Sequence, residues 1–229
     1  MGTVIIQNRT TIDPISLMGE EAGICWGADI TNQEKNYKRG VDCVKSNHGR
    51  VMEFPQVYMV LDGWSAKCIR EFYTHIGGAP TRLQSSTRYI DYSKGFEEVI
   101  PESIANDESK LKIWKDFTSQ VAPTIEKLKE LGVPNEDATN VLPLAYKTKV
   151  VVRTNLRNLI DMASMRLCNR AYWEYRKLMK DIIFALENYS EEWENLVYDL
   201  KVFQPKCEKV GFCTETRGCG KIPKKGETK

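Results

Sequence analysis

The loop over residues 76–95 carries side chains suited to binding an anion or a pyrimidine base. Arg82 and Arg88 flank the hydroxyl-bearing run 85–87, and the backbone of Gly77-Gly78 lies just upstream. Guanidinium groups and free backbone N–H groups bind phosphates and carbonyl edges well. The alternative is a solvated loop whose serine and threonine side chains cap the following element. A Walker A phosphate loop is excluded, because no Gly-Lys-Ser/Thr ends the segment.

The chain has two histidines, His48 and His75, both in polar, glycine-flanked segments. Their spacing matches no H-x-x-x-H metal pattern, so each one alone is expected to be a surface histidine. No nucleophile elbow or cysteine-centred catalytic motif accompanies them, which leaves hydrolase chemistry without support. Arg166 is different, because it falls between the apolar positions Met162 and Leu167 and therefore needs an anionic or carbonyl partner.

Seven cysteines are scattered over the chain, and the last three, Cys207, Cys213 and Cys219, are separated by five residues each. An odd number without a leader segment favours reduced thiols over a disulfide framework. Three thiolates with one further ligand could bind zinc, but the missing C-x2-C pairs favour plain surface thiols. Both interpretations stay open, and no metal ligand is assigned.

Composition excludes several classes of protein. The 229 residues are 41% hydrophobic and 28% charged, with 33 Lys and Arg against 31 Asp and Glu. Such a balance is typical of a folded globular protein and lacks the basic excess of a non-specific nucleic-acid or anionic-membrane binder. No apolar run approaches the roughly 18–20 residues that span a bilayer, and the first residues do not resemble a secretion signal. We therefore expect a cytoplasmic location, with neither nucleic acid nor membrane as partner.

Hydrophobic periodicity predicts the elements that position these residues. A β-branched and aromatic run predicts a strand over 57–61 that enters a turn at Asp62-Gly63. Residues 15–47 are expected to form short helices and loops. Apolar spacings of three and four residues predict further helices over 65–75, over 111–131 with a kink at Pro123, over 155–167, over 172–186 and, as a short turn, over 193–200.

Strands and helices are mixed without βαβ alternation, which predicts an α+β fold. After Pro205 the composition changes to Cys, Gly, Lys and Pro. We predict a single domain over residues 1–204, followed by a Cys/Lys-rich C-terminal tail over 205–229.

Three segments together resemble a known family. Residues 142–176, LPLAYKTKVVVRTNLRNLIDMASMRLCNRAYWEYR, preceded by GVPNEDA, are similar to the C-terminal half of the flavin-dependent thymidylate synthases of the ThyX type. The loop RLQSSTRY at 82–89 resembles the end of that family's signature, and NHGRVMEF at 47–54 resembles its His-x4-Glu segment. These segments span about three-quarters of the chain and occur in the family's order.

The resemblance implies a fold, a reaction and an assembly. The fold would be α+β, with mixed helices packed on an antiparallel sheet, in a homotetramer that binds FAD, dUMP and folate where subunits meet. The enzyme would be a methyltransferase that converts dUMP to dTMP by reductive methylation, with methylene-tetrahydrofolate and NADPH as co-substrates. Two alternatives remain open: the same fold and flavin acting on another pyrimidine nucleotide, and a non-catalytic nucleotide-binding protein with a metal-binding tail.

The resemblance also implies a role for individual residues. Ser86 would lie beside the reacting uracil carbon, as a positioning hydroxyl, and Arg166 would contact a pyrimidine carbonyl. The residues expected to hold dUMP are Arg70, Arg82, Gln84, Ser86, Arg88 and Arg166. The residues expected to line the flavin site are His48, Glu53, His75, Asn155, Arg157 and Asp161.

The chain departs from the family pattern where substrate phosphate would bind. Thr74 and Ile76 replace the two arginines that flank the motif histidine, and Thr139 replaces a third arginine. The usual Asn four residues after the Arg157 position is Asp161, and Phe54 follows the family glutamate in place of histidine. A phosphate dianion needs compensating charge, so we expect substitutes among Arg70, Arg82 and Lys147 or Lys149.

Overall fold

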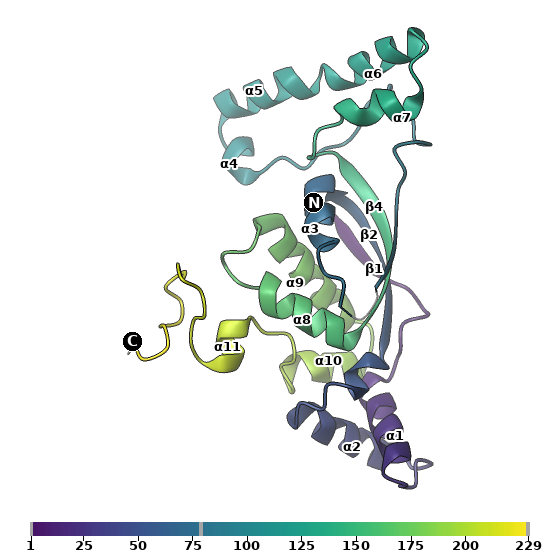
Figure 1. The fold of residues 1–229 in the computed structure, drawn as a ribbon, viewed down its shortest axis with the longest axis vertical. Coiled ribbons are helices and arrows are strands. Elements are labelled where there is room, and N and C mark those ends of the chain that lie inside the picture. Colours follow the sequence, from purple (N-terminus) through teal and green to yellow (C-terminus); the bar gives the residue numbers. More distant parts are fainter. Residues whose placement is uncertain (1, 78–79, 228–229) are drawn as a thin grey trace. The chain divides into compact units, whose positions relative to one another are not determined.

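The computed structural model describes residues 2–77 and 80–227, so Gly78 of the predicted anion loop lies outside the described residues. Its strands are β1 (Thr3–Ile6), β2 (Gln56–Ser65), β3 (Thr81–Gln84) and β4 (Lys147–Asn155) (Figure 1). The helices of the first half are α1 (Pro14–Cys25), α2 (Gln33–Lys45), η1 (Val51–Glu53), α3 (Ala66–Phe72), α4 (Glu102–Ala105) and α5 (Glu108–Thr118). Those of the second half are α6 (Val121–Glu130), α7 (Asn135–Ala138), η2 (Thr139–Val141), α8 (Leu156–Arg166), α9 (Trp173–Glu187), α10 (Glu191–Tyr198) and α11 (Lys206–Val210).

The four strands form one sheet in the order β1-β2-β4-β3. Backbone bonds from Leu156 to Pro55 and from Ala66 to Tyr146, at opposite ends of β2 and β4, show that these two strands run antiparallel. Side chains alternate along β2, where Val57, Met59 and Leu61 are all fully buried, as expected for a strand with one face on the core. The α+β class and the antiparallel sheet predicted from the sequence are confirmed.

Two predicted segments were wrong in detail. Residues 147–155 lie between the helices predicted over 111–131 and 155–167, where no strand was predicted, yet they form β4, because KTKVVVRTN alternates buried and exposed positions with β-branched residues. The single kinked helix predicted over 111–131 is two helices, α5 and α6, separated at Ser119 and Gln120. Pro123 is the third residue of α6, in the first turn, where a backbone N–H has no partner within the helix.

The segment predicted as short helices and loops contains the longer pair α1 and α2. Glycines allow the two helices to approach closely: a Cβ built on Gly19 would meet the backbone oxygen of Asn36 at 1.8 Å, and one on Gly40 would meet that of Ile15 at 1.9 Å. Any larger residue at either position would push the helices apart. The Glu192 carboxylate in α10 accepts from the Ile15 N–H at 2.6 Å, which caps α1 from across the chain.

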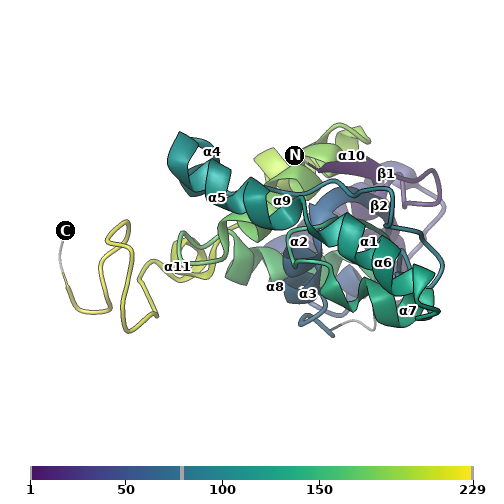
Figure 2. The ribbon, with the colours of Figure 1, turned by 90° about the horizontal axis from the view of Figure 1, so that it is seen from above.

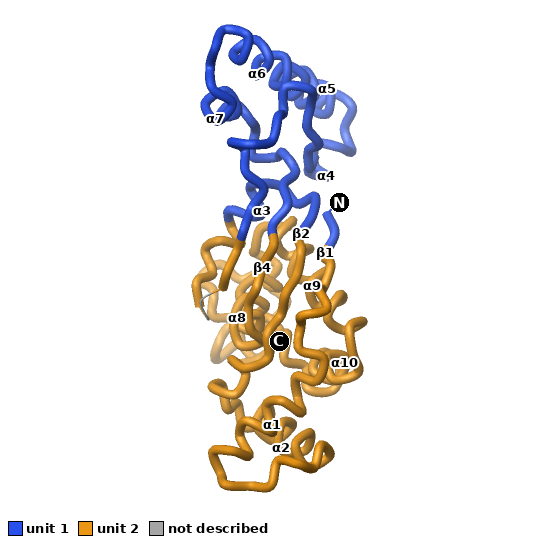
Figure 3. Tube along the Cα trace, turned by 90° about the vertical axis from the view of Figure 1, so that its right-hand side faces the viewer, with its two compact units in different colours: residues 1–3, 61–70, 83–150 blue, residues 4–60, 71–82, 151–229 orange. Residues whose placement is uncertain are grey.

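The chain divides into two compact units, coloured separately in Figure 3. Unit 1 comprises residues 1–3, 61–70 and 83–150, and unit 2 comprises residues 4–60, 71–82 and 151–229. Unit 1 has its own apolar cluster, formed by Tyr92, Val121, Ile125, Ala138 and Tyr146. The segment 205–229 belongs to unit 2, and the domain boundary at residue 204 stays a prediction. Within the described residues, no helix is both long and apolar enough to cross a bilayer.

Candidate active site

Arg166 and His75 are hydrogen-bonded to each other in unit 2. Arg166 is the last residue of α8, and its Nε donates to His75 Nε2 at 3.0 Å. A second guanidinium nitrogen donates to Thr74 Oγ1 at 3.1 Å, and a third lies 3.5 Å from a Glu71 carboxylate oxygen. The guanidinium carbon also lies 4.8 Å from the centre of the Tyr175 ring. The sequence predicted an anionic or carbonyl partner for Arg166, and Glu71 is that anion.

His75 is held as a neutral imidazole. The pKa of His75 is lowered from 6.5 to about 4, first by burial and then by the nearby positive charges of Arg166 and Arg82, whereas Glu71 opposes the shift. A protonated ring could not accept the bond from Arg166, because both of its nitrogens would then be donors. The Tyr175 ring meets the imidazole edge-on, with centroids 5.9 Å apart. His75 is therefore not the surface histidine that its sequence context alone indicated.

Arg82, expected to bind phosphate, contacts backbone carbonyls of the same unit. Its guanidinium donates to the carbonyl oxygens of Tyr73, at 3.1 Å, and of His75. It also lies over the rings of Phe72 and Tyr73, 5.5 and 5.0 Å from their centres. Its Nε is buried and has no hydrogen-bond partner among the residues that the structure describes. In this arrangement Arg82 fixes the backbone that presents His75.

A second group in unit 2 combines Arg50, Glu53 and Arg157. Arg157 donates to one Glu53 oxygen at 2.6 Å, and Arg50 donates to the other at 3.1 Å. A Cβ on Gly49 would lie 3.4 Å from the Arg157 guanidinium carbon, so the backbone passes close to that side chain. His48 is exposed next to this glycine. Two guanidinium groups share one carboxylate, which leaves a net positive charge at the surface.

Asn155 and Asp161 lie at different places along β4 and α8. The side-chain oxygen of Asn155, which is buried, accepts from the Asn158 backbone N–H at 2.9 Å and caps α8. Asp161 is exposed on α8. Of the predicted flavin residues, the structure thus brings Glu53 and Arg157 into direct contact, gives Asn155 a capping role, and leaves His48 and Asp161 exposed.

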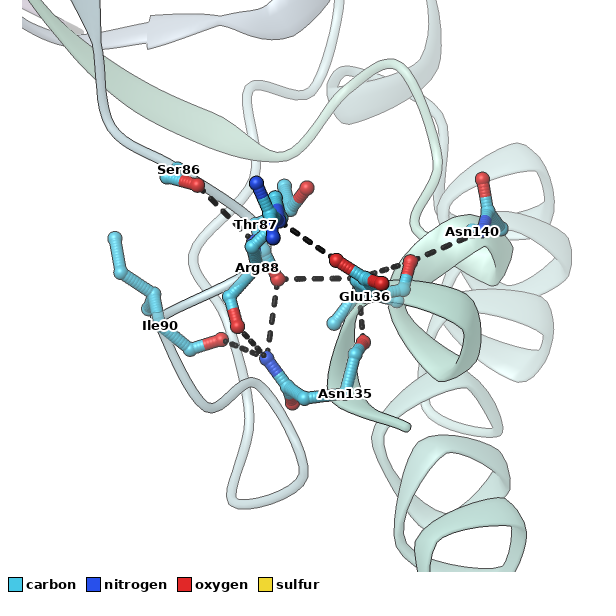
Figure 4. Close-up of polar contacts among 8 residues, drawn as sticks. Ser86, Thr87, Arg88, Ile90, Asn135, Glu136 and Asn140 are labelled. Atoms are coloured by element: carbon cyan, nitrogen blue, oxygen red, sulfur yellow. Dashed lines mark hydrogen bonds and ion pairs between the residues drawn. The ribbon is translucent and has the colours of Figure 1, made fainter. Parts of the chain in front are cut away.

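Ser86 and Arg88 lie on one loop of unit 1. The Arg88 backbone N–H donates to Ser86 Oγ at 3.2 Å, and the Arg88 side chain forms an ion pair with Glu136 in α7 at 2.6 Å (Figure 4). The Ser86 oxygen thus accepts within a local turn of the loop, while its hydroxyl hydrogen can still donate. Gln84, two residues earlier, donates to Thr148 in β4 at 3.2 Å.

Asn135 holds this loop in place. Its side-chain amide nitrogen lies 3.1, 2.9 and 3.1 Å from the carbonyl oxygens of Thr87, Arg88 and Ile90 (Figure 4). Thr139 Oγ1 lies a further 3.2 Å from the Thr87 oxygen. The backbone that carries Ser86 and Arg88 is therefore fixed by α7 and not left as a free loop.

The remaining predicted phosphate ligands are all in unit 1 and differ in their partners. A pocket of about 410 Å³ is lined by Ser85, Tyr92, Lys147 and Lys149, among others. Lys147 pairs with Glu97 at 2.6 Å, and Lys149 pairs with Asp62 at 2.7 Å. Arg70 is exposed on α3, and no partner for its side chain is found within the described residues.

Comparison with known proteins identifies the family. The family description "Thymidylate synthase complementing protein" matches residues 9–189, which is most of the chain. The chain belongs to this family. The resemblance to flavin-dependent thymidylate synthases drawn from three motifs is confirmed.

Curated relatives agree with that assignment, and solved structures share the fold. The chain is 34% identical to the flavin-dependent thymidylate synthase of Pyrococcus horikoshii, over 73% of this chain and 69% of that protein. It is 31% identical to the Geobacter sulfurreducens enzyme of the same name, over 76% and 77% of the two chains. Its fold is similar to that of the UMP/dUMP methylase PolB of Streptomyces cacaoi, with a TM-score of 0.73, 13% identity, and 90% and 98% coverage of the two chains. It is also similar to ThyX of Helicobacter pylori, solved with FAD and dUMP, with a TM-score of 0.61, 20% identity, and 87% and 99% coverage.

Several residues that shape this family member's candidate site were not predicted from its sequence. Glu71, Thr74 and Tyr175 surround the Arg166 guanidinium, and Asn135 and Glu136 hold the Ser86 loop. Asn135 and Glu136 lie in the GVPNEDA segment that carried part of the resemblance, but the sequence did not predict the contacts of their side chains. The contact between Glu71 and Arg166 gave no signal, because 95 positions separate the two residues.

Proposed function

We propose that this protein catalyses the FAD-dependent reductive methylation of dUMP to dTMP, with methylene-tetrahydrofolate as the one-carbon donor and NADPH as the reductant. Membership of the thymidylate synthase complementing family over residues 9–189 is the observation that carries this proposal. The immobilised Arg166 and the neutral His75 beside it supply the positioned polar groups that such chemistry requires from a protein.

The residues present suit a flavin dinucleotide. The surplus positive charge of Arg50 and Arg157 around Glu53 matches a diphosphate, and Gly49 leaves room beside Arg157. We propose that these residues bind FAD, with His48, His75, Asn155 and Asp161 as further contacts of the flavin site. When bound, FAD would supply the hydride chemistry that no amino-acid side chain provides.

In this proposal, dUMP is held by the loop that Asn135 anchors. Gln84, Ser86 and Arg88 would bind the nucleotide, with Ser86 as a positioning hydroxyl and no covalent nucleophile required. The ion pair between Arg88 and Glu136 is exposed on both sides, 64% and 49%, so a phosphate dianion could displace the single carboxylate. Arg70, exposed and without a partner among the described residues, is the other candidate for phosphate.

Arg166 would stabilise negative charge on a pyrimidine carbonyl. Its side chain is only 20% exposed, and its contacts with His75, Thr74 and Glu71 fix its orientation before substrate binds. A guanidinium has more N–H groups than these contacts use, so donors remain for a substrate oxygen. Charge develops on that oxygen when carbon 5 becomes nucleophilic or carbon 6 accepts hydride, and a preorganised cation lowers the cost. We further propose a homotetramer in which different subunits contribute these groups to one site.

Release of tritium from 5-tritiated dUMP tests this function directly. The purified protein should release tritium only when FAD, NADPH and methylene-tetrahydrofolate are all present, and dTMP should accumulate in proportion. A sample that binds FAD but releases no tritium from dUMP would refute the proposal. Release from labelled dCMP or UMP in preference to dUMP would instead support the alternative in which the same site acts on another pyrimidine nucleotide.

A further inference from the structure

Four of the seven cysteines line one pocket of unit 2. Cys168 follows α8, and Cys207, Cys213 and Cys219 come from the C-terminal segment, yet all four border the same cavity of about 270 Å³. The other three cysteines lie elsewhere: Cys25 is exposed on α1, and Cys43 and Cys68 are buried. The sequence pointed to three thiols and an unknown fourth ligand, and the structure supplies Cys168 as the fourth.

Contacts between the two segments bring these thiols near each other. Arg170 forms an ion pair with Glu215 at 3.1 Å, and the Asn169 side-chain nitrogen lies 3.8 Å from Cys219 Sγ. Within the C-terminal segment, Lys221 pairs with Glu208 at 2.7 Å.

The C-terminal segment has too little apolar packing to hold this arrangement by itself. No residue between 204 and 227 is buried, and α11 has only five residues. Beyond α11 the chain follows an irregular path, which Figure 2 shows in yellow. Fixing the backbone of each residue costs conformational entropy, which small segments without a core usually offset with a disulfide or a metal. The cavity-lining thiols are the groups here that could provide such a cross-link.

We propose that Cys168, Cys207, Cys213 and Cys219 bind one Zn²⁺ tetrahedrally and fasten the C-terminal segment beside Arg166. Each thiol releases its proton to solvent on binding, so the four thiolates and the cation form a centre of net charge 2−. The surroundings suit that charge, because Arg170 and Lys206 line the pocket and residues 205–229 contain seven Lys and Arg against three Glu. Among the described residues no three histidine, cysteine or carboxylate side chains lie close enough to hold a metal ion, so in this proposal zinc binding draws the four thiols together.

The site is structural in this proposal and does not depend on the proposed enzymatic function. His75 and Arg166 border the same pocket, so the segment that carries three of the thiols also forms a wall beside the candidate active site. Zinc binding should therefore order residues 205–229 whether or not the protein methylates dUMP. The two proposals can fail separately.

The experiment measures zinc in the full-length protein after loading with excess Zn²⁺ and desalting. We expect about one equivalent per chain, and below roughly a tenth of an equivalent in Cys213→Ser and in Cys219→Ser. Cys25→Ser is the matched control, because that exposed cysteine lies on α1, and it should keep the full equivalent. Replacing zinc by Co²⁺ should give the intense sulfur-to-metal absorption of a thiolate site in the parent protein and in Cys25→Ser only.

Two outcomes would overturn the proposal. One is a zinc content that Cys213→Ser and Cys219→Ser leave unchanged. The other is a metal-free parent protein, including the case in which mass spectrometry finds these cysteines joined as disulfides. Circular dichroism of each variant should match that of the parent protein, because the substituted side chains lie outside the buried core, and protease cleavage after residue 205 should become faster when zinc is removed by a chelator.

Discussion

The neutral state of His75 makes a quantitative prediction about stability and pH. The pKa of His75 is about 4 in the folded protein and near 6.5 in the unfolded chain. At pH values above both of these pKa values, the ring is neutral in the folded and the unfolded state, so it contributes no pH dependence to stability. Between these pKa values the unfolded chain takes up a proton that the folded protein excludes, so stability falls as the pH drops from about 6.5 to about 4. Below the folded-state pKa the loss is complete and stays constant.

The size of the loss follows from the change in pKa. Moving from 6.5 to about 4 at 1.36 kcal/mol per unit corresponds to about 3.4 kcal/mol for a fully buried ring. The ring of His75 is only partly buried, and solvent screening reduces the expected value to about 1–2 kcal/mol. Urea unfolding at fixed protein concentration, at roughly pH 7.5 and roughly pH 5, measures this loss of unfolding free energy.

The variant His75→Gln isolates this contribution. Its amide oxygen can still accept from Arg166 but cannot titrate, so the variant should lose about 1–2 kcal/mol less than the parent protein on acidification. Carboxylates titrate in both proteins and cancel in the difference. His48→Gln, at the exposed histidine, should behave like the parent protein. Equal pH dependence in His75→Gln and the parent protein would show that the Arg166 pair does not require a neutral ring.

Three further predictions concern the nucleotide. Ser86→Ala should slow tritium release from dUMP roughly 5- to 10-fold without abolishing it, the effect of one neutral hydrogen bond; complete loss of turnover with dUMP binding intact would show a covalent or proton-transfer role. Asn135→Ala removes the donor to three loop carbonyls, so it should cost about 1–3 kcal/mol of unfolding free energy and raise the KM for dUMP. Asn140→Ala is the control, because that amide donates only to exposed carbonyls of α7, and it should not raise the KM. Arg70→Ala should weaken dUMP binding about 10-fold by loss of a charge-assisted contact. Arg82→Ala should weaken dUMP binding and also lower the stability of the fold. An unchanged Kd for dUMP in both variants would exclude Arg70 and Arg82 as phosphate ligands.

The helices that hold the site could be predicted from periodicity because their patterns are local. Buried positions recur at helical spacing in α8 and α9, and Asn155 marks the start of α8 as an N-cap. The β4 strand was missed for the same local reason, since its nine residues include three Lys and Arg that reduce its apparent hydrophobicity. Only pairing with β2 and β3 makes that alternation a strand.

The candidate site could be predicted residue by residue but not contact by contact. The need of Arg166 for an anion followed from its position on an apolar face, yet Glu71 could not be chosen from the sequence, because 95 positions separate the two residues. The same holds for Asn135, which lies about 47 positions from the carbonyls it contacts. Such contacts depend on tertiary structure, which no single-sequence pattern encodes.

The missing motif arginines have a physical consequence that the structure makes specific. With Thr74 at the first of these positions, the Arg166 guanidinium gains a neutral hydroxyl partner at 3.1 Å where the family has a like charge. A second arginine there would repel Arg166 and Arg82, both already close to His75. Arg166 and Arg82 are held in unit 2 by internal contacts, so in the proposed function the phosphate charge would fall mainly to side chains of unit 1. Lys147 and Lys149 would each first have to give up a carboxylate, and Arg88 would have to give up Glu136, so a dianion would bind these three side chains only by displacing their present partners. Arg70 needs no such exchange. Arg70→Ala should therefore weaken dUMP binding and leave the free energy of unfolding unchanged.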